Sequence, residues 1–302
     1  MKRILLQLAA LALAVSVPVA MAWPTAPRDD MPLSTQEMRA LIERAIANQH
    51  RNDAALAEFE RREHRITHKR ETDERAEEDK LFRVVPTGTG TLRLILEERG
   101  QPVSREYYRE QLRELEKTLV WALHPDESRQ KQRVQKWNKR VKERAETVDA
   151  VRDVFIPTWR GRETRGGRPL VKVQLDPNPK FNATSRTTEM FAHVRAVVWI
   201  EPASAQLARV EAEVVRDISV GGGVLGKVYR GGKFAMEQVE VAEGVWLPTR
   251  IQYDFKGRKF VFGFEMHEVT ETGGYSRIGP PQTALAAIRR ELNDTPAGNS
   301  SH

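Results

Sequence analysis

The chain of 302 residues contains no cysteine. Disulfide bonds and cysteine-ligated zinc are therefore excluded. A lipid anchor of the lipoprotein type is excluded as well, because it is attached to a cysteine at the cleavage site. A secreted domain of this length can still fold without cross-links, since it can bury a sizeable apolar core.

Long apolar runs are also missing, apart from one at the N-terminus. Two basic residues precede the apolar stretch 4–15, and Ala20-Met21-Ala22 forms a small-x-small cleavage site. This order is typical of a secretory signal peptide. We predict a signal peptide at 1–22 that is cleaved after Ala22, so that the protein is exported; an uncleaved membrane anchor is the alternative.

Neither sign of charge dominates. The chain has 49 Lys and Arg against 42 Asp and Glu, and loss of Lys2 and Arg3 with the signal peptide lowers the formal net charge from +7 to +5. The two signs are interleaved, which is typical of a solvated surface and not of a nucleic-acid-binding stripe. No nucleic-acid partner is predicted, whereas peripheral contact with an anionic membrane stays open.

The sequence also lacks a recognisable catalytic or metal-binding motif. It has neither HExxH nor GxSxG. His64 and His68 have a spacing that suits a metal on a helix, but 58–66 is predicted to be a strand. The stretch 221–227 resembles a phosphate-binding loop, yet Val228 replaces the required Ser or Thr and a strand follows. We predict no catalytic residue, no metal and no cofactor, and we predict that the protein is not an enzyme.

Three apolar stripes with helical periodicity occur in the sequence, one in the segment after residue 34 and two in segment 104–150. After the proline-rich, extended segment 23–33, Ser34 and Glu37 form the pattern of a capping box for a helix that ends near residue 50. Segment 104–150 is predicted to be a charged helical hairpin, a lid or insertion whose apolar stripes pack on the sheet; a DNA-reading helix pair is the alternative. The three stripes are Met38, Leu41, Ile42, Ala45 and Ile46; Tyr108, Leu112, Leu115, Leu119 and Leu123; and Val134, Trp137, Val141, Ala145 and Val148.

Segments 56–98 and 155–272 instead alternate apolar and polar residues, with glycine-containing turns between them. Such alternation gives each strand one buried and one solvated face. The short connections predict eight to ten antiparallel strands. A sheet of this size twists, and its apolar face needs closure or a cover of helices. An α+β fold with a large curved antiparallel sheet and a helical lid satisfies both requirements.

Several motifs between 167 and 277 resemble the LolA-like group of outer-membrane lipoprotein-sorting proteins, in particular its uncharacterised secreted branch. They are Gly167-Arg168-Pro169, Asp176-Pro177-Asn178-Pro179, Val198-Trp199-Ile200-Glu201-Pro202, Leu207-Ala208-Arg209-Val210-Glu211, Gly221-Gly222-Gly223 and Val245-Trp246-Leu247-Pro248-Thr249. The resemblance implies an unclosed, LolA/LolB/RseB-like β-barrel at 34–277, periplasmic localisation, and transport or binding of acyl chains in an apolar concavity. A short helix and flexible tail are expected at 278–302.

The resulting hypothesis is a non-catalytic carrier for an acyl chain, lipid or lipoprotein. Trp199 and Trp246 are candidate rim residues. The candidate lining consists of Val194, Ala196, Val198, Ile200, Val210, Ala212, Val214, Leu247, Ile251, Tyr253, Phe260, Phe262, Phe264 and Met266. Aromatic side chains that fill the hollow would favour the alternative, an envelope interaction or sensor module that docks a protein partner through the basic hairpin. A hydrolase with an unrecognised site is a third possibility.

Overall fold

The computed structural model describes residues 31–124, 128–183, 185–220, 226–260 and 262–294. The predicted signal peptide with its cleavage site after Ala22 lies outside these residues, as do most of 23–33 and the tail from 295. The chain divides into two units, Met1–Met31 and Pro32–His302, and the fold below is that of the second. No helix of the described segments is both long and apolar enough to cross a bilayer.

Thirteen strands of the described residues form one sheet, and every pairing between them is antiparallel. The strands are β1 (Phe59–His68), β2 (Glu78–Pro86), β3 (Thr91–Glu98), β4 (Gln101–Pro102), β5 (Phe155–Arg165), β6 (Arg168–Pro177), β7 (Val194–Glu201), β8 (Gln206–Val214), β9 (Ile218–Val220), β10 (Gly226–Val228), β11 (Lys233–Ala242), β12 (Val245–Lys259) and β13 (Phe262–Arg277). The helices are α1 (Thr35–Leu56), α2 (Arg105–Ala122), α3 (Ser128–Val154), α4 (Arg186–Phe191) and α5 (Pro281–Asp294).

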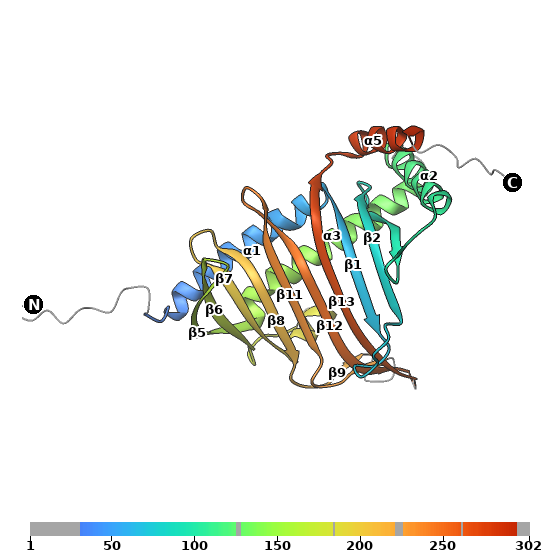
Figure 1. The fold of residues 1–302 in the computed structure, drawn as a ribbon. Coiled ribbons are helices and arrows are strands. Elements are labelled where there is room, and N and C mark those ends of the chain that lie inside the picture. Colours follow the sequence, from blue (N-terminus) through green and yellow to red (C-terminus); the bar gives the residue numbers. More distant parts are fainter. Residues whose placement is uncertain (1–30, 125–127, 184, 221–225, 261, 295–302) are drawn as a thin grey trace, which may run out of the picture. The chain divides into compact units, whose positions relative to one another are not determined.

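The strand order is β4-β3-β2-β1-β13-β12-β11-β8-β7-β6-β5, with β9 and β10 joined to the end of β12 (Figure 1). Pairing of β1 with β13 connects the N-terminal strands to the C-terminal ones. The end strands β4 and β5 do not pair with each other, so the sheet is not closed. The predicted fold class, α+β with a large unclosed antiparallel sheet, is confirmed.

Helices α1 and α3 cover one face of the sheet, called here the inner face (Figure 1). The predicted capping box is present, since the Glu37 N–H donates to Ser34 Oγ and the Ser34 N–H donates to Glu37 Oε2. The predicted stripe of α1 is buried in full, against β5 to β8. Packing of that stripe on the aliphatic strands explains why α1 lies here, because each surface covers the other's apolar side.

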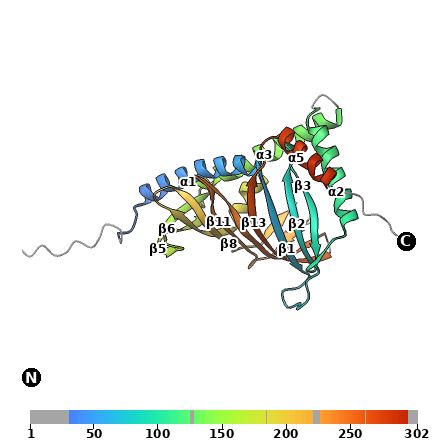
Figure 2. The ribbon, with the colours of Figure 1, turned by 45° about the horizontal axis from the view of Figure 1, so that its top comes forward.

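Helix α2 lies on the opposite, outer face and packs with α5 (Figure 2). Leu112, Leu115 and Leu119 contact Leu94 and the C-terminal helix, forming a second apolar core over β2 and β3. The expected hairpin at 104–150 therefore needs correction, because its two helices form but pack on different faces of the sheet. The reason is α5, whose own apolar stripe offers α2 a partner.

Candidate functional site

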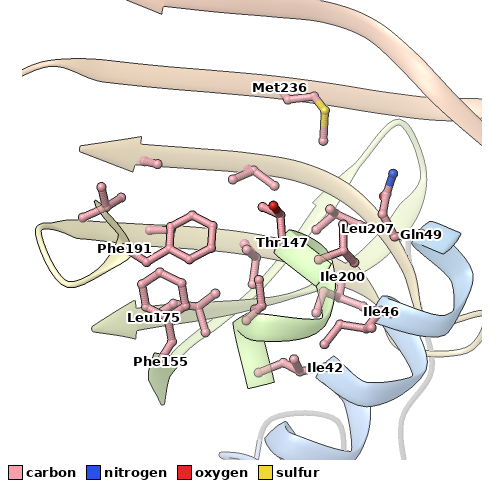
Figure 3. A pocket seen from close by; sticks show the side chains of 18 of the residues that line it. Ile42, Ile46, Gln49, Thr147, Phe155, Leu175, Phe191, Ile200, Leu207 and Met236 are labelled. Carbon is pink, nitrogen blue, oxygen red and sulfur yellow. The ribbon is translucent and has the colours of Figure 1, made fainter. Parts of the chain in front are cut away.

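An apolar cavity of about 310 Å³ lies between α1, α3 and the strands β5 to β8 and β11 (Figure 3). Its volume falls near the lower end of the range for small-molecule sites, about 300–1,000 Å³. Among the described residues that line it, the polar ones are Gln49, Arg144 and Thr147. The apolar lining consists of Ile42, Ala45, Ile46, Val148, Val151, Phe155, Leu175, Phe191, Val194, Ala196, Val198, Ile200, Leu207, Val210, Ala212, Phe234 and Met236.

Strand alternation builds the floor of this cavity. Residues directly opposite each other on antiparallel strands share a face. In the observed register Val173 lies opposite Val198, Val198 opposite Val210, and Val210 opposite Met236. The result is a continuous aliphatic row across β6, β7, β8 and β11 on the inner face.

Buried amides fix α1 above that floor. Asn48 Nδ2 donates to the carbonyls of Ser204 and Ala205, each at 2.8 Å. Asn52 Nδ2 donates to Gln206 Oε1 at 2.9 Å, and Asn52 Oδ1 accepts from the Trp246 N–H at 3.0 Å. Hydrogen bonds between buried polar groups are costly to break, because each group then remains unsatisfied. Helix α1 is thus a rigid wall of the cavity.

Helix α3 is held differently, by an ion pair and a histidine–carboxylate hydrogen bond that water partly reaches. Arg144 Nε lies 2.9 Å from Asp53 Oδ2, and His50 Nε2 lies 3.0 Å from Asp149 Oδ1. Exposed pairs of this kind contribute little, about 0.2–1 kcal/mol each. The polar contacts of α3 are therefore weaker than those of α1, while Val151 and Val154 pack it on the apolar core.

A second hollow of about 170 Å³ continues the inner face over β1, β3, β12 and β13. It adjoins the apolar cavity, because Phe234 of the first lies opposite Tyr253 of the second, with ring centroids 5.4 Å apart. Its character is polar, and burial raises the pKa of Tyr253. The lining consists of Leu56, Arg61, Glu63, Arg65, Arg93, Pro248, Ile251, Tyr253, Glu268, Thr270, Thr272 and Tyr275.

Glu63 is the centre of this polar hollow. Its Oε1 accepts from Arg61 Nε at 2.9 Å and its Oε2 accepts from Arg93 Nε at 2.8 Å. The side chains of Arg61 and Glu63 are each only 9% exposed. Nearby, Tyr275 donates its hydroxyl to the Pro248 carbonyl at 2.5 Å, and burial raises the pKa of that phenol. Glu63 thus pairs with two arginines at once, and the hollow is lined by charges of both signs.

The predicted lining residues separate into four groups. Val194, Ala196, Val198, Ile200, Val210 and Ala212 line the apolar cavity, and Ile251 and Tyr253 line the polar hollow beside it. Val214 and Leu247 are buried but border neither space. The prediction of Phe260, Phe262, Phe264 and Met266 as lining is corrected: they lie toward the far ends of β12 and β13, outside both spaces. Alternation indicates which residues share a face but not how far the helices cover it.

The two candidate rim tryptophans also need correction, because both are buried outside the cavity. Trp199 lies between Lys172 Nζ and the Arg209 guanidinium, at 4.8 and 5.4 Å from its ring centroid. The Arg168 guanidinium lies 5.1 Å from the Trp246 ring centroid. Cation–π contacts of this type stabilise a desolvated aromatic ring.

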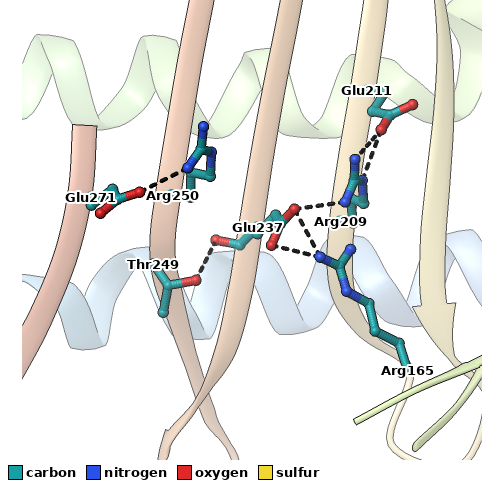
Figure 4. Close-up of polar contacts among 7 residues, drawn as sticks. All are labelled: Arg165, Arg209, Glu211, Glu237, Thr249, Arg250 and Glu271. Atoms are coloured by element: carbon teal, nitrogen blue, oxygen red, sulfur yellow. Dashed lines mark hydrogen bonds and ion pairs between the residues drawn. The ribbon is translucent and has the colours of Figure 1, made fainter. Parts of the chain in front are cut away.

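Arg209 belongs to a row of alternating charges on the outer face (Figure 4). Its Nη1 donates to Glu237 Oε1 at 2.6 Å, and Arg165 Nη2 donates to both Glu237 oxygens at 3.0 Å. Arg250 Nη1 pairs with Glu271 Oε1 at 2.7 Å. These pairs involve the polar side chains that alternate with the inward-facing apolar ones along each strand. At this point the outer face is therefore a solvated surface of paired charges.

Sequence reasoning missed several cavity residues. Phe234 and Met236 alternate on β11 in the same way as the recognised residues of β8, and this signal was available in the sequence. Val148 belongs to the predicted stripe of α3, although its position over the cavity was not predicted. Phe191 comes from the short helix α4, and no periodicity marks a helix of this length.

In the comparisons with known proteins, the chains found to be similar to this one are solved structures. No family model matches the sequence, and no curated protein matches it. A LolA superfamily protein from Nitrosomonas europaea has a TM-score of 0.32 and 11% identity, over 84% of this chain and 97% of its own. A putative outer membrane lipoprotein-sorting protein domain from Vibrio parahaemolyticus has a TM-score of 0.31 and 9% identity, over 82% and 100%. A DUF1329 family protein from Desulfovibrio piger has a TM-score of 0.29 and 10% identity, over 79% and 92%.

Proposed function

We propose that the protein is a periplasmic, non-catalytic carrier that holds the acyl chain of a lipid or lipoprotein in the cavity beneath α1 and α3. The observation that carries this proposal is the near absence of polar groups from the cavity wall. Each methylene group transferred from water into such a space gains about 0.8 kcal/mol. No covalent chemistry is needed for this function.

The adjoining polar hollow supports an amphipathic ligand. Because Phe234 and Tyr253 separate the two spaces, a chain in the apolar cavity places its polar end near the hollow of Arg61, Arg65 and Arg93. Release requires one wall to move. Helix α3 is the better candidate for that movement, since its exposed ion pairs are weaker than the buried amide contacts of α1.

The direct test is uptake of a fluorescent fatty acid, together with mass spectrometry of lipid that copurifies with the protein. Val198→Arg inserts a charge into the cavity floor and should abolish uptake, or unfold the domain, because an unpaired buried charge is strongly unfavourable. Val197→Arg is the matched control: its neighbour in register is Glu211 on the outer face, and uptake should be unchanged.

A second variant keeps the test decisive if Val198→Arg does not fold. Ala212→Phe fills the cavity without adding charge, since Ala212 lines it and is only partly buried. We expect a thermal midpoint close to that of the wild type and at least tenfold weaker uptake. Unchanged uptake by a folded Ala212→Phe protein would show that the ligand does not occupy this cavity.

A further inference from the structure

Large aromatic side chains at the far ends of β12 and β13 leave much of their surface in solvent. Phe262 is 74% exposed, Phe260 50%, Phe264 38%, and Tyr229 just after β10 is 40% exposed. Strand β10 brings Tyr229 to this point, because Gly226–Val228 pair with Gly257–Lys259. Isolated exposed aromatics are ordinary, but several at one end of a sheet form a patch of the type that marks an interaction site.

The turn between these strands has a conformation that does not suit its residue. Lys259 lies opposite Phe262, and Phe260 in the turn has a φ of +54°. Glycine and asparagine adopt this left-handed conformation readily, whereas a bulky aromatic does so with strain. Half of the Phe260 surface stays exposed, so the fold buries the ring only in part in return. Strain combined with exposure indicates that the ring serves something outside the fold.

Basic side chains surround the exposed rings. Lys256, Arg258 and Lys259 lie on β12, and Lys69 and Arg70 of the β1–β2 connection border the same hollow as Tyr229 and Phe264. Lys227 lies on β10 beside them, with Nζ 5.9 Å from the Tyr229 ring centroid.

Carboxylates are fewer than cations on β10, the end of β12 and the start of β13, whereas the β1–β2 connection also contains Asp73, Glu74 and Glu77. Asp217 pairs with Lys227 at 2.7 Å, and Glu265 and Glu71 pair with Lys256 at 3.5 and 3.7 Å. The patch therefore combines exposed aromatic rings with an excess of positive charge. The strand ends that carry these residues lie at the lower edge of the sheet in Figure 1, where β12 ends and β13 begins.

We propose that this aromatic tip (Tyr229, Lys259, Phe260, Phe262 and Phe264) docks on the surface of an anionic phospholipid bilayer. The rings enter the boundary between headgroups and acyl chains, and the surrounding Lys and Arg side chains contact the phosphates. A second copy of the chain fits less well, because a twofold contact would bring the same cations against each other. The proposal does not depend on the cavity, and its test is separate.

The test is flotation of the purified, processed chain with vesicles, after its N-terminus has been determined, since a retained leader would itself bind lipid. Vesicles of phosphatidylcholine alone are compared with vesicles containing about one third phosphatidylglycerol. We expect binding to the anionic vesicles only, and loss of that binding at about 1 M salt. Absence of binding to the anionic vesicles would overturn the proposal.

Variants then assign the contact to the tip. Phe262→Ser should weaken vesicle binding about tenfold or more, because a fully inserted ring is lost. Tyr107→Ser removes an aromatic side chain that is 43% exposed on α2, and this variant should bind as the wild type does. Equal losses in both variants, or none in Phe262→Ser, contradict the assignment. So does a dimer in light scattering that Phe262→Ser dissociates, which would assign the tip to a second copy.

Phe260→Asn separates a docking role from a structural one. Asparagine tolerates the left-handed turn, so the thermal midpoint should rise or stay unchanged. Vesicle binding should nevertheless weaken by several-fold. Stabilisation without loss of binding would show that Phe260 has no part in docking. Lys259→Glu should also weaken binding, whereas Lys117→Glu on α2 should leave it unchanged.

Discussion

The inner face of the sheet has two halves that share one backbone pattern and differ in chemistry. Over β5 to β8 and β11 the inward side chains are aliphatic, and helices close the space above them. Over β1, β3, β12 and β13 the inward side chains include Arg61, Glu63, Arg93 and Thr270. Alternation along a strand therefore determines which side chains share a face. The chemistry of those side chains determines whether the face suits an acyl chain or a polar group.

The largest expected effect in this comparison concerns Glu63, the carboxylate shared by Arg61 and Arg93. Glu63→Leu leaves two arginines unpaired, one of them buried, and should destabilise the fold by about 3–5 kcal/mol. The measurement is the urea dependence of unfolding. A gain in stability would show that the polar half tolerates apolar residues as well as the other half does.

Two controls sharpen this prediction. Glu63→Gln keeps the shape and one acceptor, so its loss should be smaller than that of Glu63→Leu. Glu271→Leu removes the partner of Arg250 on the outer face, where both side chains are well exposed. Its loss should not exceed about 1 kcal/mol, the usual limit for a solvated pair.

Much of the apolar half could be predicted from the sequence, because its signals are local. The capping box at Ser34 and Glu37 and the alternation of Val194, Ala196 and Val198 need no knowledge of the rest of the chain. The polar half has no such signal. Strand β1 reads Phe-Glu-Arg-Arg-Glu-His-Arg-Ile from Phe59, with charges on both faces. Only the pairing of β1 with β13 shows which of these charged side chains lie on the inner face.

The limits of the helical cover could not be predicted either. The apolar stripes of α2 and α3 look equivalent in the sequence, and only the stripe of α5 explains why α2 lies on the outer face. For the same reason Phe262 and Phe264 were assigned to the lining. Their alternation is real, yet neither α1 nor α3 reaches that end of the sheet. Tertiary coverage depends on partners distant in the chain, and periodicity contains no information about them.

A smaller effect is expected from Tyr275, which also lines the polar half. Tyr275→Phe keeps the ring against Phe59 but removes the hydrogen bond to the Pro248 carbonyl, which should cost about 1 kcal/mol. The difference should depend on pH. Burial raises the pKa of Tyr275 in the folded state, so its neutral hydroxyl contributes fully below the pKa of the unfolded chain, about 10. That contribution declines as the pH rises above this value.

The measurement is the free energy of unfolding of both proteins between neutral pH and about pH 11. The gap between wild type and Tyr275→Phe should narrow at the alkaline end. Tyr107→Phe provides the control at neutral pH, because Tyr107 is exposed and its replacement should leave the free energy of unfolding nearly unchanged there. A constant gap for Tyr275→Phe would mean that the phenol ionises equally in the folded and unfolded chain.

The smallest effect is expected where the two halves meet, at Arg144. This residue lines the apolar cavity, and its ion pair with Asp53 fastens α3 to α1. Arg144→Asp replaces attraction by repulsion and should speed release of a bound fluorescent fatty acid by about two- to fivefold, since a solvated pair contributes about 1 kcal/mol at most. The double variant Asp53→Arg/Arg144→Asp restores opposite charges and should return release toward the wild-type rate. If both variants release ligand equally fast, charge between the helices does not govern opening, and the weaker polar contacts of α3 have no bearing on exchange.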